Sequence, residues 1–158
     1  MQPETQPPAS DRTSPASPIV CRRLPPSYGS LSFIMEFIVA APEFGGMQSR
    51  VLFPALKAQI QHGYNVAAYR NQKLVGYCGW LNTTEEIAQQ WLKNAGKLYG
   101  VPVASSNAVA LTIVRVVDRE AVMPIIRSCR QLNGERRVFF KREPRGAQAE
   151  RKSSVYNN

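Results

Sequence analysis

The chain has 158 residues, with 20 Lys and Arg against 11 Asp and Glu, a formal charge of +9 and a sequence pI of about 9.9. These values are typical of one globular domain whose charge favours acidic partners such as nucleic acid, an anionic lipid surface or an acidic protein. The longest apolar run, residues 31–42, is shorter than the roughly 20 residues of a membrane-spanning helix. A single histidine and three widely spaced cysteines exclude a His/Cys zinc site, and no glycine-rich nucleotide motif occurs.

The N-terminal region differs in composition from the rest of the chain. Seven of the twelve prolines fall before residue 28, among Ser, Thr, Gln and Ala. Such a segment buries too little apolar surface to offset the entropy of ordering. We therefore expect a disordered leader over 1–28, a folded domain over 29–144 and a basic, flexible tail over 145–158. The leader has no secretory signal, and the number of cysteines is odd, which fits a reducing compartment. We therefore expect a cytoplasmic protein.

Hydrophobic periodicity predicts the elements of the folded domain. A helix is expected over 32–39, ended by Pro42, and a second over 48–61, with Pro54 near its first turn and Gly63 after its end. A β-hairpin follows, with strands at 65–70 and 74–80. The remaining elements are a helix at 85–95, a strand at 108–117, a helix at 120–132 and a strand at 136–141. This order predicts an α+β fold, a single mixed β-sheet flanked by helices.

Positive charge is densest at the C-terminal end of the sequence. Residues 134–158 carry seven basic and three acidic residues. Candidate partner-binding residues are Arg136, Arg137, Lys141, Arg142 and Arg145. Three interpretations stay open: solvated surface charge, docking to an acidic protein, and nucleic-acid binding through phosphates with interleaved aromatic side chains.

Three neighbouring segments carry a more specific pattern. They read Phe-Pro-Ala-Leu-Lys at 53–57, Tyr-Asn-Val-Ala-Ala-Tyr-Arg at 64–70 and Leu-Val-Gly-Tyr-Cys-Gly-Trp at 74–80. This stretch resembles the N-terminal half of the RTX-toxin-activating lysine acyltransferases, of the haemolysin-activating type. The resemblance extends over residues 29–155, and its motif content lies in 53–87.

The resemblance implies a GNAT-like fold and an activity. In that family a fatty acyl group moves from acyl carrier protein to internal lysines of a protein toxin, in the cytoplasm. It implies no bound cofactor, acyl-acyl carrier protein as co-substrate, and no coenzyme A phosphate loop. Acyl carrier protein is acidic, which suits a basic domain. A homodimer is a further open alternative.

The catalytic residues of the family have no match in this chain. The family's histidine lies upstream of the Pro-Ala motif, whereas residues 40–46 here contain none, and the strand matching the family's aspartate has apolar or hydroxyl residues there. Three weaker candidates remain for acid–base chemistry. His62 is either a base or a helix C-terminal residue, Asp118 either orients a reacting group or caps the following helix, and Glu43 is either a base or an exposed loop residue.

The strand at 74–80 supplies the candidate substrate-binding residues. Tyr77 and Trp80 match the family pattern, and Trp80 either lines an acyl cleft or packs in the core. Cys78 is expected to be a buried structural thiol, because no histidine lies near it in sequence. Two functions follow: a protein-lysine acyltransferase, or a catalytically degenerate relative that binds protein or nucleic acid through its basic C-terminal face.

Overall fold

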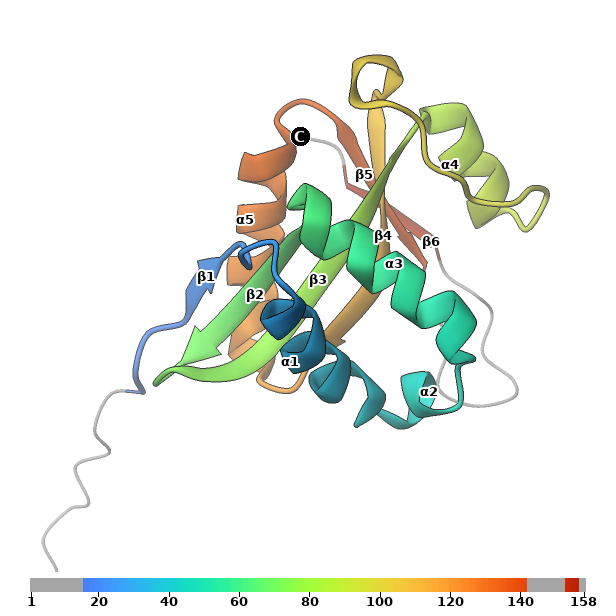
Figure 1. The fold of residues 1–158 in the computed structure, drawn as a ribbon. Coiled ribbons are helices and arrows are strands. Elements are labelled where there is room, and N and C mark those ends of the chain that lie inside the picture. Colours follow the sequence, from blue (N-terminus) through green and yellow to red (C-terminus); the bar gives the residue numbers. More distant parts are fainter. Residues whose placement is uncertain (1–15, 142–152, 157–158) are drawn as a thin grey trace, which may run out of the picture.

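The computed structural model describes residues 16–141 and the strand at 153–156. Its centre is one sheet whose six strands are adjacent in chain order (Figure 1). Only β4 and β5 are parallel to each other among the described pairs. The strands are β1 (Val20–Arg22), β2 (Asn65–Arg70), β3 (Lys73–Thr83), β4 (Ala108–Val116), β5 (Arg137–Lys141) and β6 (Ser153–Tyr156). The predicted α+β class with a mixed sheet is confirmed.

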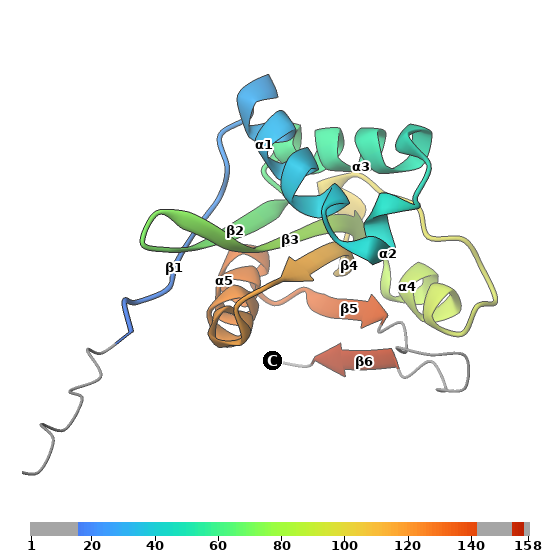
Figure 2. The ribbon, with the colours of Figure 1, turned by 90° about the horizontal axis from the view of Figure 1, so that it is seen from below.

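Helices cover both faces of this sheet (Figure 2). One face carries α1 (Tyr28–Val39), α2 (Pro42–Gly45) and α3 (Ser49–His62), and the other carries α5 (Val122–Asn133). Helix α4 (Glu85–Leu92) packs beside β4 and β5, and two short 3-10 turns, η1 (Val103–Ser105) and η2 (Arg119–Ala121), precede β4 and α5. No helix in the described part of the chain is long and apolar enough to cross a bilayer.

Each face has its own apolar core. The core under α1 and α3 is mostly aliphatic and includes Leu31, Ile34, Ile38, Leu52, Leu56, Ile60, Tyr77 and Ile113. The core under α5 includes Val66, Cys78, Trp80, Val109, Ile125 and Cys129, and a smaller cluster under α4 contains Phe139. These two cores hold β3 from opposite sides, which makes it the most buried strand.

Local signals account for most element ends. The Ser27 hydroxyl accepts from the Ser30 amide at the start of α1, and Thr84 does the same for Ile87 in α4. Gly63 ends α3 with a φ of 69°, and Asn71 with its neighbour Gln72 has positive φ in a two-residue hairpin turn. The expected helix at 85–95 ends earlier, at Leu92, and Pro54 lies in the second turn of α3 rather than near the first.

The leader was expected to reach residue 28, and this boundary is wrong. β1 pairs with β2 from Val20 to Arg22, and Leu24 is buried with its amide donating to Asn65 Oδ1 at 3.0 Å. Residues 16–28 therefore join the domain, because β2 offers them an open edge and the core offers a place for Leu24. The other end differs similarly, since β6 lies within the segment expected to be a flexible tail. Residues 1–15 and the expected boundary at 144 lie outside the described residues.

A β-bulge interrupts β4 at Thr112. The β3–β4 register passes from Gly79 opposite Ile113 directly to Trp80 opposite Leu111, so Thr112 is an extra residue. Pairing between β4 and β5 ends at the preceding residue, where Leu111 lies opposite Phe140. β5 ends one residue further on, at Lys141, and the ribbons of the two strands point in different directions there (Figures 1 and 2). The bulge thus coincides with the divergence of the only parallel pair among the described strands.

Candidate functional site at the β4–β5 divergence

The second half of β4 is an open edge inside the sheet. Residues 113–116 pair with β3 on one side, Thr112 is the unpaired bulge residue, and no described residue pairs with 112–116 on the β5 side. Thr112 and Val114 are both exposed. Unpaired amide and carbonyl groups of this kind bind an extended chain by adding it as a strand. This edge is the part of the described sheet best suited to bind a ligand that contains amides.

A buried glutamine connects α3 to the bulge. The Gln59 side chain is 3% exposed, and its Nε2 donates to Thr112 Oγ1 at 2.8 Å. Tyr77 Oη donates to Gln59 Oε1 at 3.0 Å. A Cβ atom at Gly79 would lie 1.9 Å from Gln59 Oε1, so only glycine leaves room for the amide. The Gln59 amide is therefore satisfied at both atoms, and its orientation is fixed against Thr112.

The phenol of Tyr77 is kept neutral in this network. Burial raises the pKa of Tyr77 well above its ordinary value, and the neighbouring Cys78 thiol acts in the same direction. A neutral phenol is a hydrogen-bond donor, which fits its bond to Gln59 Oε1. Tyr77 therefore supports the glutamine rather than taking part as an anion.

The connection from β4 to α5 carries two carboxylates that pair with one arginine. Arg70 Nε lies 2.7 Å from Asp118 Oδ2, and its Nη2 pairs with Glu120. Asp118 Oδ1 also accepts from the Glu120 amide at 3.0 Å, so Asp118 caps η2. The hydrogen bond from Arg70 is the main reason that the pKa of Asp118 is lowered. Arg70 and Arg119 balance the two carboxylates, so the connection presents no net positive charge to attract a diphosphate.

The three candidate acid–base residues lie far apart. His62 is exposed at the end of α3, where its ring stacks on Tyr64 with centroids 5.4 Å apart. Asp118 is held by Arg70 at the opposite end of β2, and a six-residue strand spans about 20 Å. Glu43 is exposed on α2, before the N-terminal end of α3, and 14 helical residues also span about 20 Å. The structure therefore does not assemble these residues into one site, and Asp118 takes the predicted capping role.

Tyr77 and Trp80, predicted to bind substrate, are both buried. Their exposed fractions are 0% and 2%, and they belong to the cores on opposite faces of the sheet. Trp80 packs with Ile125 and Cys129 under α5. Cys78, predicted to be a buried thiol, is buried beside Cys129 with 3.6 Å between the two sulfur atoms. The placement of Trp80 favours core packing over the lining of an acyl cleft.

The basic residues of β5 make contacts within the chain. Arg136 Nη1 donates to Asn82 Oδ1 at 2.9 Å, and Arg137 pairs with a glutamate of α4 at 2.6 Å. Lys141 Nζ donates to an asparagine after α4 and lies 4.7 Å from the ring centroid of Trp91. These contacts tie β5 to α4 and to the end of β3. Arg142 and Arg145 lie outside the described residues.

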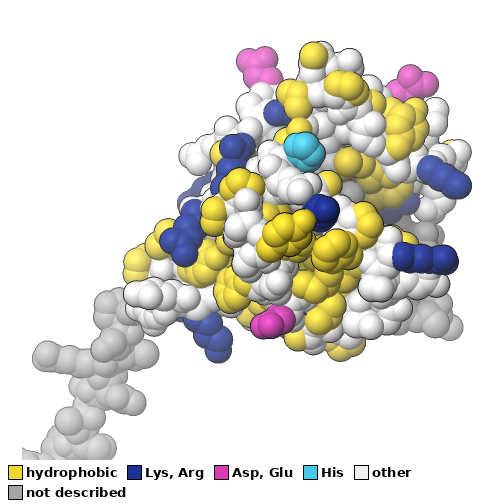
Figure 3. All heavy atoms as spheres, viewed as in Figure 1, with side chains coloured by type: hydrophobic (Ala, Val, Ile, Leu, Met, Phe, Trp, Pro, Cys, Tyr) yellow, Lys and Arg dark blue, Asp and Glu magenta, His cyan; other side chains and the backbone are white. Residues whose placement is uncertain are grey.

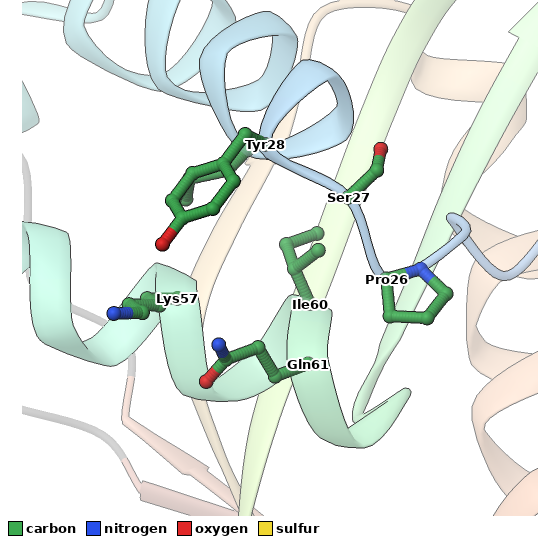
Figure 4. Close-up of a pocket in the computed structure, with 7 residues that line it drawn as sticks. Pro26, Ser27, Tyr28, Lys57, Ile60 and Gln61 are labelled. Carbon is green, nitrogen blue, oxygen red and sulfur yellow. The ribbon is translucent and has the colours of Figure 1, made fainter.

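The surface over α1 and α3 has a further hollow, but its lining has no acid–base pair for catalysis. Figure 3 shows apolar side chains and scattered basic ones on this face, with the histidine exposed. The hollow lies between the start of α1 and the second half of α3 (Figure 4). Its lining is Pro26, Ser27, Tyr28, Leu31, Lys57, Ile60 and Gln61. This lining has an amine and a phenol but no carboxylate or imidazole, and no described cluster of His, Cys, Asp and Glu fits a metal ion.

Solved structures identify the fold. An agmatine N-acetyltransferase in its apo form superposes with a TM-score of 0.55 and 17% identity, over 78% of this chain and 75% of that one. A GNAT-family acetyltransferase from Streptococcus agalactiae gives 0.54 and 9%, over 79% and 76%, and a Drosophila melanogaster polyamine N-acetyltransferase gives 0.51 and 15%, over 78% and 76%. The protein therefore has the fold of the GNAT acetyltransferases.

The comparisons go no further than this fold. No protein-family model matches the chain, and no curated protein is significantly similar to it in sequence. The GNAT-like part of the sequence-based resemblance is confirmed, whereas nothing in the comparisons supports the toxin-activating family in particular.

Sequence reasoning missed the residues that shape the open edge. Gln59, Thr112 and Gly79 were not candidates, although the sequence held two signals. Gln59 is a polar residue on the inward stripe of an otherwise apolar helix face, and Gly79 interrupts a strand of bulky residues. A buried glutamine opposite a strand glycine indicates close approach of the two elements.

Proposed function

We propose that this protein is an acyltransferase that binds an acyl thioester along the open edge of β4 and transfers the acyl group to a lysine amine. The observation that carries the proposal is the bulge at Thr112, located where β4 and β5 diverge. It exposes strand edge next to a hydroxyl group in the interior of the sheet. The GNAT fold, shared with acetyltransferases that act on amines such as agmatine, supports the reaction class.

The reaction needs a carbonyl held in place and a neutral amine. A pantetheine arm contains two amides, so it can pair with residues 112–116 as an added strand and bring its thioester to the bulge. The amine then attacks the carbonyl carbon, the C–N bond forms, the C–S bond breaks, and the thiol leaves. The amine proton passes to water, because His62, Asp118 and Glu43 do not assemble into one site with Thr112 in the described structure.

The electrostatics favour acyl carrier protein as the donor over coenzyme A. In the connection that follows β4, Asp118 and Glu120 pair with Arg70, so this connection offers no net positive charge to hold a nucleotide diphosphate. A carrier protein brings the pantetheine arm on its own acidic surface, and a chain with a charge of +9 attracts it. The resemblance at 53–87 favours a lysine within a protein toxin as the acceptor.

The proposal is tested by acyl transfer from a carrier protein. Purified protein is incubated with octanoyl-acyl carrier protein and a lysine-containing acceptor peptide, and intact mass spectrometry follows both. We expect loss of the octanoyl group from the carrier and gain by the peptide, with a much slower reaction from octanoyl-coenzyme A. Transfer no faster than with heat-denatured protein would overturn the proposed function.

A second candidate is a non-catalytic binding protein with the same fold. It is favoured by one observation, the separation of His62, Asp118 and Glu43 by about 20 Å along β2 and α3. Such a protein would bind an acidic protein or nucleic acid through the basic residues of β5 and the segment after it. If the protein binds nucleic acid, its affinity in a gel-shift assay should fall steeply as the salt concentration rises. The absence of a shift at low salt would exclude nucleic-acid binding.

A further inference from the structure

We propose that Thr112 donates its hydroxyl proton to the thioester carbonyl oxygen and that Gln59 is a positioning residue that holds the hydroxyl in this direction. This inference rests on the proposed function, because it assigns residues to the same site. It extends that function by naming side chains that distinguish a thioester from a similar compound without a carbonyl.

The hydrogen bond from Gln59 leaves the Thr112 hydroxyl proton pointing away from the glutamine. Gln59 Nε2 donates to Thr112 Oγ1 at 2.8 Å, so one lone pair of the hydroxyl oxygen is occupied. Within the described part of the chain no group accepts the Thr112 proton, and Thr112 is exposed. The proton is therefore available to a ligand, and a carbonyl oxygen at the open edge is the acceptor that the proposed reaction supplies.

The orientation of Gln59 is set by two neighbours. The Tyr77 hydroxyl donates to Gln59 Oε1, which fixes the amide so that Nε2 faces the bulge. Gly79 leaves the space that the amide fills, since any Cβ there would overlap it. A flipped amide would place Oε1 against Thr112, and the hydroxyl would then donate to the glutamine instead of the ligand. The hydrogen bonds thus run in one direction, from Tyr77 through Gln59 to Thr112 at the open edge.

A structural role alone would give a different pattern of effects. If the network only held α3 to the sheet, removing either hydrogen bond would lower stability and leave ligand discrimination unchanged. If Thr112 contacts the carbonyl, discrimination depends on its hydroxyl and on the Gln59 amide that orients it. Thr112→Val removes the hydroxyl at nearly constant volume, and Thr112→Ser keeps it. Tyr77→Phe releases the Gln59 amide without changing Thr112, and Tyr28→Phe, which removes a phenol hydroxyl from an exposed side chain outside the network, is the matched control.

The test compares two ligands on the full-length protein. S-octanoyl-pantetheine contains the thioester carbonyl, and S-octyl-pantetheine is the matching thioether. Titration calorimetry gives the ratio of their affinities for each variant. One hydrogen bond to the carbonyl predicts that the wild-type protein prefers the thioester by about three- to tenfold. We expect Thr112→Val and Gln59→Met to abolish this preference, Tyr77→Phe to weaken it because the Gln59 amide is then free to flip, and Thr112→Ser and Tyr28→Phe to retain it.

The outcomes separate the inference from the proposed function. Equal affinity of the wild-type protein for both ligands overturns the inference and leaves thioester binding intact. An unchanged preference in Thr112→Val also overturns the inference. Failure of S-octanoyl-pantetheine to bind the wild-type protein overturns the proposed function and the inference with it. Loss of preference in Thr112→Val with recovery in Thr112→Ser supports both.

Discussion

Gly79→Ala tests the packing of the site most severely. The new methyl group would lie 1.9 Å from Gln59 Oε1 and 2.3 Å from Gln59 Cδ. The glutamine is 3% exposed, so its amide has no free space to enter and must break its bonds to Tyr77 and Thr112. The substitution therefore acts on the network that shapes the bulge rather than on β3 alone.

The cost is worked out from these contacts. Two lost hydrogen bonds contribute about 1 kcal/mol each, and a buried Tyr77 hydroxyl without an acceptor adds about 1–3 kcal/mol. Replacing glycine by alanine within a strand returns about 0.5–1 kcal/mol. The expected loss of unfolding free energy is thus about 2–4 kcal/mol. At about 4 °C per kcal/mol, the midpoint of thermal unfolding should fall by about 8–16 °C.

Two controls make the assay specific. Gly46→Ala is the matched substitution, because a Cβ there has nothing within 4 Å, and it should leave the unfolding midpoint nearly unchanged. In a Gln59→Ala background the clash is absent, so Gly79→Ala should cost almost nothing further. The assignment of Gln59 to this space would be refuted if Gly79→Ala left the unfolding midpoint unchanged. It would also be refuted if Gly79→Ala lowered the midpoint equally in the wild-type and Gln59→Ala backgrounds.

Other predictions follow from single side chains. Arginine pairing lowers the pKa of Asp118, so its ionised form stabilises the fold above the ordinary aspartate pKa, and this contribution is lost as the pH falls through the lowered value. Asp118→Asn should therefore reduce the unfolding midpoint at pH 7, and by progressively less as the pH falls below the ordinary aspartate pKa. An aromatic disulfide reagent should label Cys21 slowly in the native protein, because burial raises the pKa of the Cys21 thiol. It should label the buried Cys78 and Cys129 only after unfolding, and equal reaction rates for all three thiols would contradict this. Trp80→Ala should cost about 3–5 kcal/mol in urea unfolding as a core residue, whereas a cleft residue would lower acyl transfer with little change in stability.

Local sequence signals predicted much of the fold. The turn at Asn71, the cap at Thr84 and the glycine after His62 act within a few residues, so their effect can be read without the tertiary structure. β1 could not be found this way. It is three residues long in a proline-rich stretch, and it exists because β2 presents an open edge.

The site was predicted less well than the fold. His62 was chosen as the single imidazole and Glu43 for its position relative to a family motif, and α3 then separates them, with His62 at its C-terminal end and Glu43 on α2 before its start. The bulge at Thr112 depends on the register between β3 and β4, which no local pattern in the sequence specifies. Gln59 could have been detected from the sequence, because it is a polar residue on the buried face of α3.

The most direct test of the account is a map of where an acyl thioester binds. S-octanoyl-pantetheine is titrated into the isotopically labelled full-length protein, and the backbone amide signals are followed by NMR. We expect the largest shifts at residues 111–116 and at Gly79, with saturation at a single affinity. Shifts confined to the hollow between α1 and α3, or no shifts at all, would contradict the assignment of the open β4 edge as the binding site.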